Sequence, residues 1–142
     1  MRIRHTGILG IVLLATAAAA IQIHAAASVD GQQYAGTWNG NWEGAGGSGR
    51  FDLTIQVGSD GNLAGGVSVG TDQGDYTAKF SKIDFAGNKM TGTYDYPLDA
   101  QGEVSITGTF DAKGASGTWG LGAKGQSGGQ TVAEGTWKTE KK

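Results

Sequence analysis

Aromatic side chains are the residues of this sequence whose type and spacing could do chemistry. The chain has four tryptophans and four tyrosines in 142 residues. Trp38 and Trp42 are four residues apart and Tyr94 and Tyr96 are two apart, so each pair shares one face of an extended strand. Rings gathered on one face could form the stacking wall of a pocket for an apolar or planar ligand, and Tyr76 could add a further polar tip. The candidate ligand-binding residues are Trp38, Trp42, Tyr94, Tyr96, Trp119 and Trp137.

Carboxylates are the other candidates, because histidine and cysteine are missing from most of the chain. Both histidines, His5 and His24, lie in the first 27 residues, and there is no cysteine. This excludes Ser-His-Asp and Cys-His nucleophiles and histidine or thiolate metal sites from residues 28–142. A glycosidase needs two carboxyl groups and no histidine. Glu43, Glu103 and Glu134 fall at predicted outward positions, however, so we predict no catalytic residue and no enzyme.

Aspartates in predicted loops could bind a hard cation. Asp60, Asp72 and Asp75 are the candidates. Calcium sites bring several oxygens together, and no ordered loop signature such as an EF-hand is present. Asp60-Gly61 is typical of a turn. We therefore expect no metal and no cofactor.

The first 27 residues resemble a secretory signal peptide. Arg2 and Arg4 precede an apolar run over residues 8–21, and Ala25 and Ala27 form an A-x-A cleavage site. The alternative is an uncleaved anchor, but the run is shorter than the roughly 20 residues that a spanning helix needs. We predict a secreted or periplasmic protein with a signal peptide at 1–27 and a single β-barrel domain at 28–142, not bound to a membrane after cleavage.

The charge of residues 28–142 argues against polyanionic partners. These residues contain nine basic and thirteen acidic side chains, a net charge of −4. Mild acidity without a basic run disfavours nucleic acid and anionic membrane surfaces. A small hydrophobic or aromatic ligand is the expected partner, and the oligomeric state is left open.

A repeated Gly-Thr-aromatic phrase indicates the elements that position the rings. In a strand, each copy puts glycine and ring on one face and threonine on the other. A ring can then lie over the bare glycine backbone of a neighbouring strand, which fixes register and lets a coiled sheet curl. The phrase begins at Gly36, Gly92, Gly108, Gly117 and Gly135.

Alternating hydrophobicity predicts an all-β, antiparallel up-and-down meander of about eight strands, closed as a small barrel. Phe51, Leu53, Ile55 and Val57 alternate without error. The parity changes between Phe80 and Ile83, which predicts a bulge near Ser81 and Lys82. The predicted strands are 36–43, 51–57, 63–69, 76–85, 89–96, 103–110, 116–122 and 131–139.

Gly36-Thr37-Trp38, followed by an alternating strand, Asp60-Gly61 and later Gly-Thr-aromatic copies, resembles the calycin barrels, which are the lipocalins and avidins. Those families place a Gly-x-Trp near the start of the first strand. The chain also looks like small exported bacterial β-barrel proteins of unknown function. It lacks the disulfide frequent in lipocalins and has no carboxy-terminal helical pattern. The resemblance implies a barrel fold and a ligand in its interior.

Barrel closure would pair the first strand with the last and place all four tryptophans on three adjacent strands. This aromatic seam has three interpretations. It could line an interior pocket for a small apolar or aromatic ligand, or it could only fill the core of a structural or protein-interaction module. Rings near the rim could instead stack on sugars, as in a carbohydrate-binding module.

Overall fold

The structure, a computed structural model, describes residues 30–125 and 131–142. These residues confirm the predicted fold class, an all-antiparallel β meander. The predicted signal peptide lies outside the described residues. Within them, no helix has the length and hydrophobicity needed to span a bilayer. The elements are η1 (Gln32–Tyr34), β1 (Gly36–Gly44), β2 (Gly47–Val57), β3 (Leu63–Val69), β4 (Tyr76–Lys79), β5 (Lys82–Ala86), β6 (Lys89–Asp95), β7 (Gly102–Phe110), β8 (Gly114–Ala123) and β9 (Ala133–Lys141).

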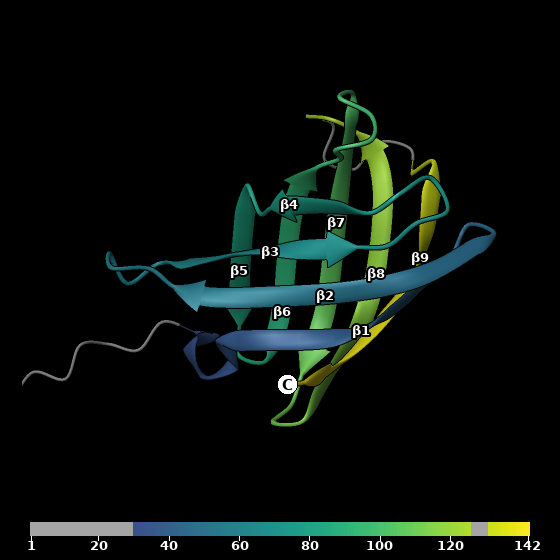
Figure 1. The fold of residues 1–142 in the computed structure, drawn as a ribbon. Coiled ribbons are helices and arrows are strands. Elements are labelled where there is room, and N and C mark those ends of the chain that lie inside the picture. Colours follow the sequence, from purple (N-terminus) through teal and green to yellow (C-terminus); the bar gives the residue numbers. More distant parts are fainter. Residues whose placement is uncertain (1–29, 126–130) are drawn as a thin grey trace, which may run out of the picture.

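All nine described strands belong to one sheet, in the order β4-β3-β2-β1-β9-β8-β7-β6-β5. The first strand pairs with the last, with Trp42 opposite Trp137. Figure 1 shows β1 to β4 running across the face formed by β5 to β8, so the sheet curls back over itself. The two edge strands, β4 and β5, do not pair with each other. The fold is therefore a half-barrel, compatible with a calycin-like fold, rather than the fully hydrogen-bonded barrel that the pattern predicts.

The predicted strand 76–85 is two strands, which is why nine are present instead of eight. The expected bulge at Ser81 is a break in the strand. Here the chain passes from one arm of the sheet, β1 to β4, to the other arm, β5 to β9. The Phe80 N–H donates to Gly65 O on β3, and the Ser81 N–H donates to Thr93 O on β6, each at 2.9 Å. Consecutive residues thus bond to different arms, and the parity of the inward side chains reverses between them.

The first hairpin is tighter than its glycine-rich sequence suggests. The predicted strands 36–43 and 51–57 leave residues 44–50 as their connection, whereas β1 extends to Gly44 and β2 already begins at Gly47. The two linking residues, Ala45 and Gly46, have φ values of 47° and 79°. Two successive positive φ values are typical of a type I′ turn, whose twist suits an antiparallel pair. The short turn lets β1 and β2 remain paired to their ends.

The centre of the half-barrel is packed with side chains from both arms. Trp38 on β1 is 0% exposed and meets Phe110 on β7 edge-on, with 4.9 Å between ring centroids. Its Nε1 donates to Tyr34 O at 2.9 Å, so burial leaves no polar group without a partner. Tyr34 and Phe85 also pack against Phe110, each with a centroid distance of 5.2 Å.

Aromatic rings lie over glycines, as the Gly-Thr-aromatic phrase predicts. A Cβ built on Gly108 would be 2.3 Å from the Trp137 ring, and one on Gly135 would be 2.7 Å from Trp119 Nε1. Trp42 covers Gly49 in the same way, at 2.8 Å. At Gly108 the ring is the nearest group, whereas at Gly49 and Gly135 a backbone carbonyl oxygen is closer still, at 2.0 and 1.9 Å. Ring and neighbouring backbone together leave no room for a side chain at these positions.

Candidate functional site

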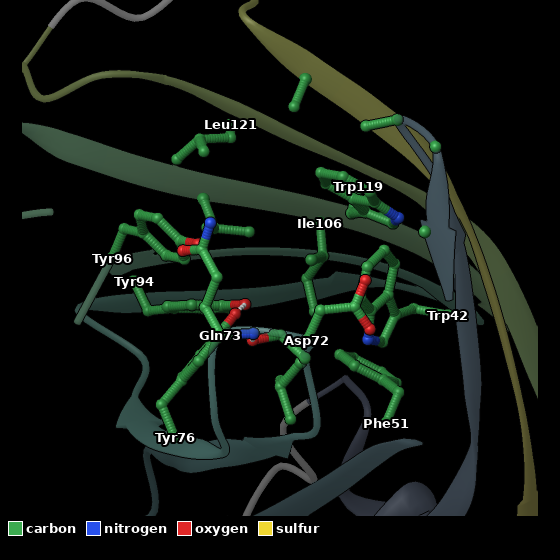
Figure 2. Close-up of a pocket in the computed structure, with 17 residues that line it drawn as sticks. Trp42, Phe51, Asp72, Gln73, Tyr76, Tyr94, Tyr96, Ile106, Trp119 and Leu121 are labelled. Atoms are coloured by element: carbon green, nitrogen blue, oxygen red, sulfur yellow. Dashed lines mark hydrogen bonds between the residues drawn. The ribbon is translucent and has the colours of Figure 1, made fainter. Parts of the chain in front are cut away.

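A pocket of about 320 Å³ opens at one end of the half-barrel. Aromatic and aliphatic side chains form most of its wall, and a few polar loop residues complete it (Figure 2). Such a composition is typical of small-molecule sites. The lining residues are Trp42, Ala45, Gly46, Gly47, Phe51, Val69, Thr71, Asp72, Gln73, Tyr76, Tyr94, Tyr96, Val104, Ile106, Trp119, Leu121 and Ala133.

Antiparallel connectivity explains why these residues meet. The chain does not reverse between β4 and β5, so these two count as one strand of the meander, and alternate connections then lie at the same end of the sheet. The β1–β2 turn and the loop 70–75 between β3 and β4 both contribute to the pocket, as do the end of β8 and the start of β9. Below them, inward side chains of β2, β3 and β7 form the floor, beyond which the core is filled.

Two tryptophans form a corner of the wall. The rings of Trp42 on β1 and Trp119 on β8 lie 5.5 Å apart with an interplanar angle of 90°. Trp42 Nε1 donates to Gly70 O at 2.8 Å, and Trp119 Nε1 donates to Glu43 O at 3.2 Å. Because backbone carbonyls already accept both N–H groups, the indoles offer a ligand ring surface rather than hydrogen-bond donors.

Three tyrosines face this corner. The hydroxyls of Tyr76 and Tyr94 are 2.9 Å apart and share a hydrogen bond. The rings of Tyr76 and Tyr96 meet edge-on, with centroids 5.7 Å apart. Tyr94 is 2% exposed, and this burial raises its pKa above the usual tyrosine range, with the neighbouring Tyr76 as a further cause. Burial also raises the pKa of Tyr76. Both phenols are therefore neutral at physiological pH.

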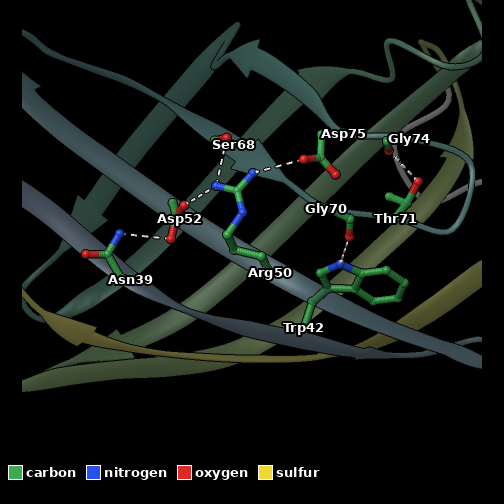
Figure 3. Close-up of polar contacts among 9 residues, drawn as sticks. All are labelled: Asn39, Trp42, Arg50, Asp52, Ser68, Gly70, Thr71, Gly74 and Asp75. Carbon is green, nitrogen blue, oxygen red and sulfur yellow. Dashed lines mark hydrogen bonds and ion pairs between the residues drawn. The ribbon is translucent and has the colours of Figure 1, made fainter.

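The β3–β4 loop, residues 70–75, covers one side of the pocket and is held at both ends (Figure 3). At its start, Gly70 O accepts the Trp42 bond. At its end, Arg50 Nη2 lies 3.5 Å from Asp75 Oδ2, and Arg50 also contacts Asp52. Within the loop, Thr71 Oγ1 donates to Gly74 O at 2.7 Å. These contacts fix the backbone that carries Asp72 and Gln73.

The structure separates the six predicted ligand-binding residues into two groups. Trp42, Tyr94, Tyr96 and Trp119 line the pocket. Trp38 and Trp137 do not line it. Both are buried, and Trp137 Nε1 donates to Thr107 O and Thr118 O at 3.1 and 3.2 Å. The four tryptophans do lie on the adjacent strands β1, β9 and β8, but only one end of the seam borders open space.

Of the carboxylates considered for catalysis or metal binding, only Asp72 lines the pocket. Glu43, Glu103 and Glu134 do not line the pocket. Asp60 accepts the Asn62 N–H at 3.0 Å in the β2–β3 turn, and this bond lowers its pKa. Asp75 pairs with Arg50. Within 30–125 and 131–142, no group of three or more histidine, cysteine or carboxylate side chains could hold a metal ion.

The sequence prediction did not assign the loop residues Thr71, Asp72 and Gln73 to the ligand site, and it considered Asp72 only as a possible ligand of a hard cation. It treated 70–75 as a polar connection, yet these residues border the pocket. A usable signal was present, because an up-and-down meander places alternate turns at one end. The turns near 45–49, 70–75 and 97–102 would therefore surround the same mouth. The floor residues Phe51, Val69, Val104 and Ile106 carried no signal beyond their inward parity.

No protein-family model, curated protein or solved structure matches this sequence.

Proposed function

We propose that this protein is a non-enzymatic binding protein that takes a small apolar or aromatic ligand into the pocket at the end of the half-barrel. The observation that carries the proposal is the ring-walled corner of Trp42 and Trp119, which faces the tyrosines across open space. A core built only for stability fills such space, since interiors pack to crystal-like density. Here aromatic and aliphatic side chains fill the centre of the half-barrel, and side chains of the same kinds line an open pocket at its end.

The size and polarity of the pocket indicate the kind of ligand. Its volume, about 320 Å³, lies at the lower end of the range for small-molecule sites. The indole N–H groups and the Tyr76 and Tyr94 hydroxyls have partners within the protein. Binding then depends on burial of apolar area and ring stacking, worth roughly 25 cal/mol per Å² for the buried area.

Binding of a neutral fluorescent probe tests this proposal. N-phenyl-1-naphthylamine emits strongly in apolar surroundings, and we expect a saturable rise in its emission with the purified protein. Ala133 lines the pocket, so Ala133→Phe fills it and should weaken binding at least tenfold. Val132 is the adjacent residue and is 76% exposed. Val132→Phe is the matched control and should leave the affinity unchanged.

Three results would favour the other interpretations of the aromatic seam. Equal affinity in both variants, or no saturable binding in a folded protein, would contradict the pocket proposal and favour a structural or interaction module. Saturable binding of an oligosaccharide without binding of the probe would favour a carbohydrate-binding module, in which rings stack on sugars.

We further propose that the protein acts in the periplasm or outside the cell, on the basis of the charged, apolar and A-x-A segments of residues 1–27. The mass of the protein recovered from a bacterial expression host should correspond to a chain that begins at Ser28. Recovery of the uncut chain from the cytosol would contradict export.

A further inference from the structure

We propose that the ligand of this pocket is a small organic cation, such as an alkylated ammonium group carried on an apolar body. This inference rests on the proposed binding function and narrows its ligand class. Three features of the pocket carry it: the charge of the lining side chains, the ion pairs that Arg50 and Lys124 already make, and the orientation of the lining rings.

The lining contains one charged side chain, the carboxylate of Asp72, and no lysine or arginine. Asp72 has no ion-pair partner among residues 30–125 and 131–142. Figure 2 shows it and Gln73 extending from the β3–β4 loop between the tyrosines and the two tryptophans. A single carboxylate beside an apolar wall raises the local concentration of cations and repels anions.

Two basic side chains that contact carboxylates beside lining residues in the sequence are already engaged. Arg50 contacts Asp52 and Asp75, and Lys124 Nζ lies 3.0 Å from Asp95 Oδ2. These pairs leave Asp72 as the carboxylate that a ligand can meet. An anionic ligand such as a fatty acid would find no basic side chain in the lining and would be disfavoured by Asp72.

The ring geometry suits a compact cation. The face of an aromatic ring carries negative charge density and attracts cations, most strongly for tryptophan. Two rings at a right angle, such as Trp42 and Trp119, form a corner that a rounded group can contact on two sides. Tyr76 and Tyr96 form a second corner, with an interplanar angle of 85°. Aromatic cages of this kind recognise quaternary ammonium groups, which are desolvated at little cost.

Two probes of nearly identical shape and different charge test the proposal. Phenyltrimethylammonium and tert-butylbenzene differ in one central atom, which is N⁺ in the first and carbon in the second. Each is titrated against the full protein at low ionic strength, with displacement of N-phenyl-1-naphthylamine as the readout. We expect the cation to bind about tenfold more tightly than the neutral probe.

Removal of the carboxylate supplies the matched variant. Asp72→Asn should weaken binding of phenyltrimethylammonium about three- to tenfold and leave the affinity for tert-butylbenzene unchanged. Asp99→Asn, in the neighbouring β6–β7 loop and outside the lining, should change neither affinity. Far-UV circular dichroism of each variant checks that the fold is retained.

The possible outcomes distinguish this inference from the function on which it rests. If tert-butylbenzene binds as tightly as the cation to the wild-type protein, the cation preference is overturned and the apolar pocket stands. If neither probe displaces N-phenyl-1-naphthylamine, and that dye itself does not bind, the pocket function falls and the inference with it. A cation preference that survives Asp72→Asn undiminished would overturn the role of the carboxylate.

Discussion

Trp38 and Trp42 occupy the same face of β1, four residues apart, yet they serve different purposes. Trp38 is fully buried against Phe110, whereas Trp42 is half-buried and borders the pocket. The difference is depth along the half-barrel, since both side chains point inward. One residue type can therefore stabilise the core at one position of a strand and offer a binding surface four residues further along the same strand.

Because of Tyr94, the free energy of unfolding of the protein should decrease at alkaline pH. An unfolded tyrosine ionises near pH 10, whereas burial raises the pKa of folded Tyr94. Above pH 10 the unfolded chain binds fewer protons than the folded one, so the free energy of unfolding falls as pH rises. Tyr94 alone should contribute a loss of about 1.4 kcal/mol between pH 9 and pH 11. Urea unfolding at both pH values measures it.

The variant Tyr94→Phe checks that this loss belongs to Tyr94. It should be about 1 kcal/mol less stable at pH 9, because the hydrogen bond with Tyr76 is removed. Its stability should then fall less steeply toward pH 11 than that of the wild-type protein. An identical fall in both proteins would show that other groups cause the pH dependence.

At the scale of the element, glycines decide how closely neighbouring strands can approach each other. Gly117 on β8 is an example, since a Cβ at this position would be 1.8 Å from Thr107 O on β7. The backbones approach so closely there that no side chain fits between them. We expect Gly117→Ala to lower the free energy of unfolding by about 3 kcal/mol, through forced separation of β7 and β8.

Gly120 on the same strand is the control for this prediction. A Cβ there would meet Thr131 Cγ2 at 3.4 Å, an ordinary contact. Gly120→Ala should change the stability by less than about 0.5 kcal/mol in the same urea titration. If the two variants lose equal stability, the close approach of β7 and β8 at Gly117 is not the cause of the loss.

Strand alternation was enough to predict which face of each strand is buried. Phe51, Leu53 and Ile55 are all buried, as their spacing predicts. The same rule could not separate Trp38 from Trp42, because a period of two gives the face and not the depth. It also could not distinguish a bulge from a strand break at Ser81. Both reverse parity, and only the partners of Phe80 and Ser81 decide between them.

At the scale of the whole molecule, closure and the pocket depend on pairings that no local pattern encodes. The sequence predicts a closed barrel because its first and last strands can pair, and β1 and β9 do pair. Whether the other two edges join depends on β4 and β5, which the structure leaves unpaired with each other. Asp72 and its loop become part of a site through this arrangement of distant strands, so neither could be assigned from local sequence.

Because β1 pairs with β9, the order of the strands in the sheet is a circular shift of their order in the chain. The edge strands β4 and β5 are consecutive in the chain, and the first and last strands, β1 and β9, meet in the middle of the sheet, where the Lys142 N–H donates to Thr37 O at 3.0 Å. Joining Lys142 to Asp30 by a flexible glycine-serine linker and starting the chain at Ser81 would make the two orders identical. Every paired strand would then be a sequence neighbour.

Such a circular permutant should form the same sheet and refold faster than the natural chain. In the natural chain, residues as far apart as Trp42 and Trp137 must meet before β1 can pair with β9. The permutant replaces this long loop closure with a local hairpin, and lower contact order speeds folding. Stopped-flow tryptophan fluorescence measures both refolding rates. A permutant that refolds no faster would mean that the pairing of β1 with β9 is not the slow step, and one that fails to fold would mean that the Phe80–Ser81 link holds the two arms together.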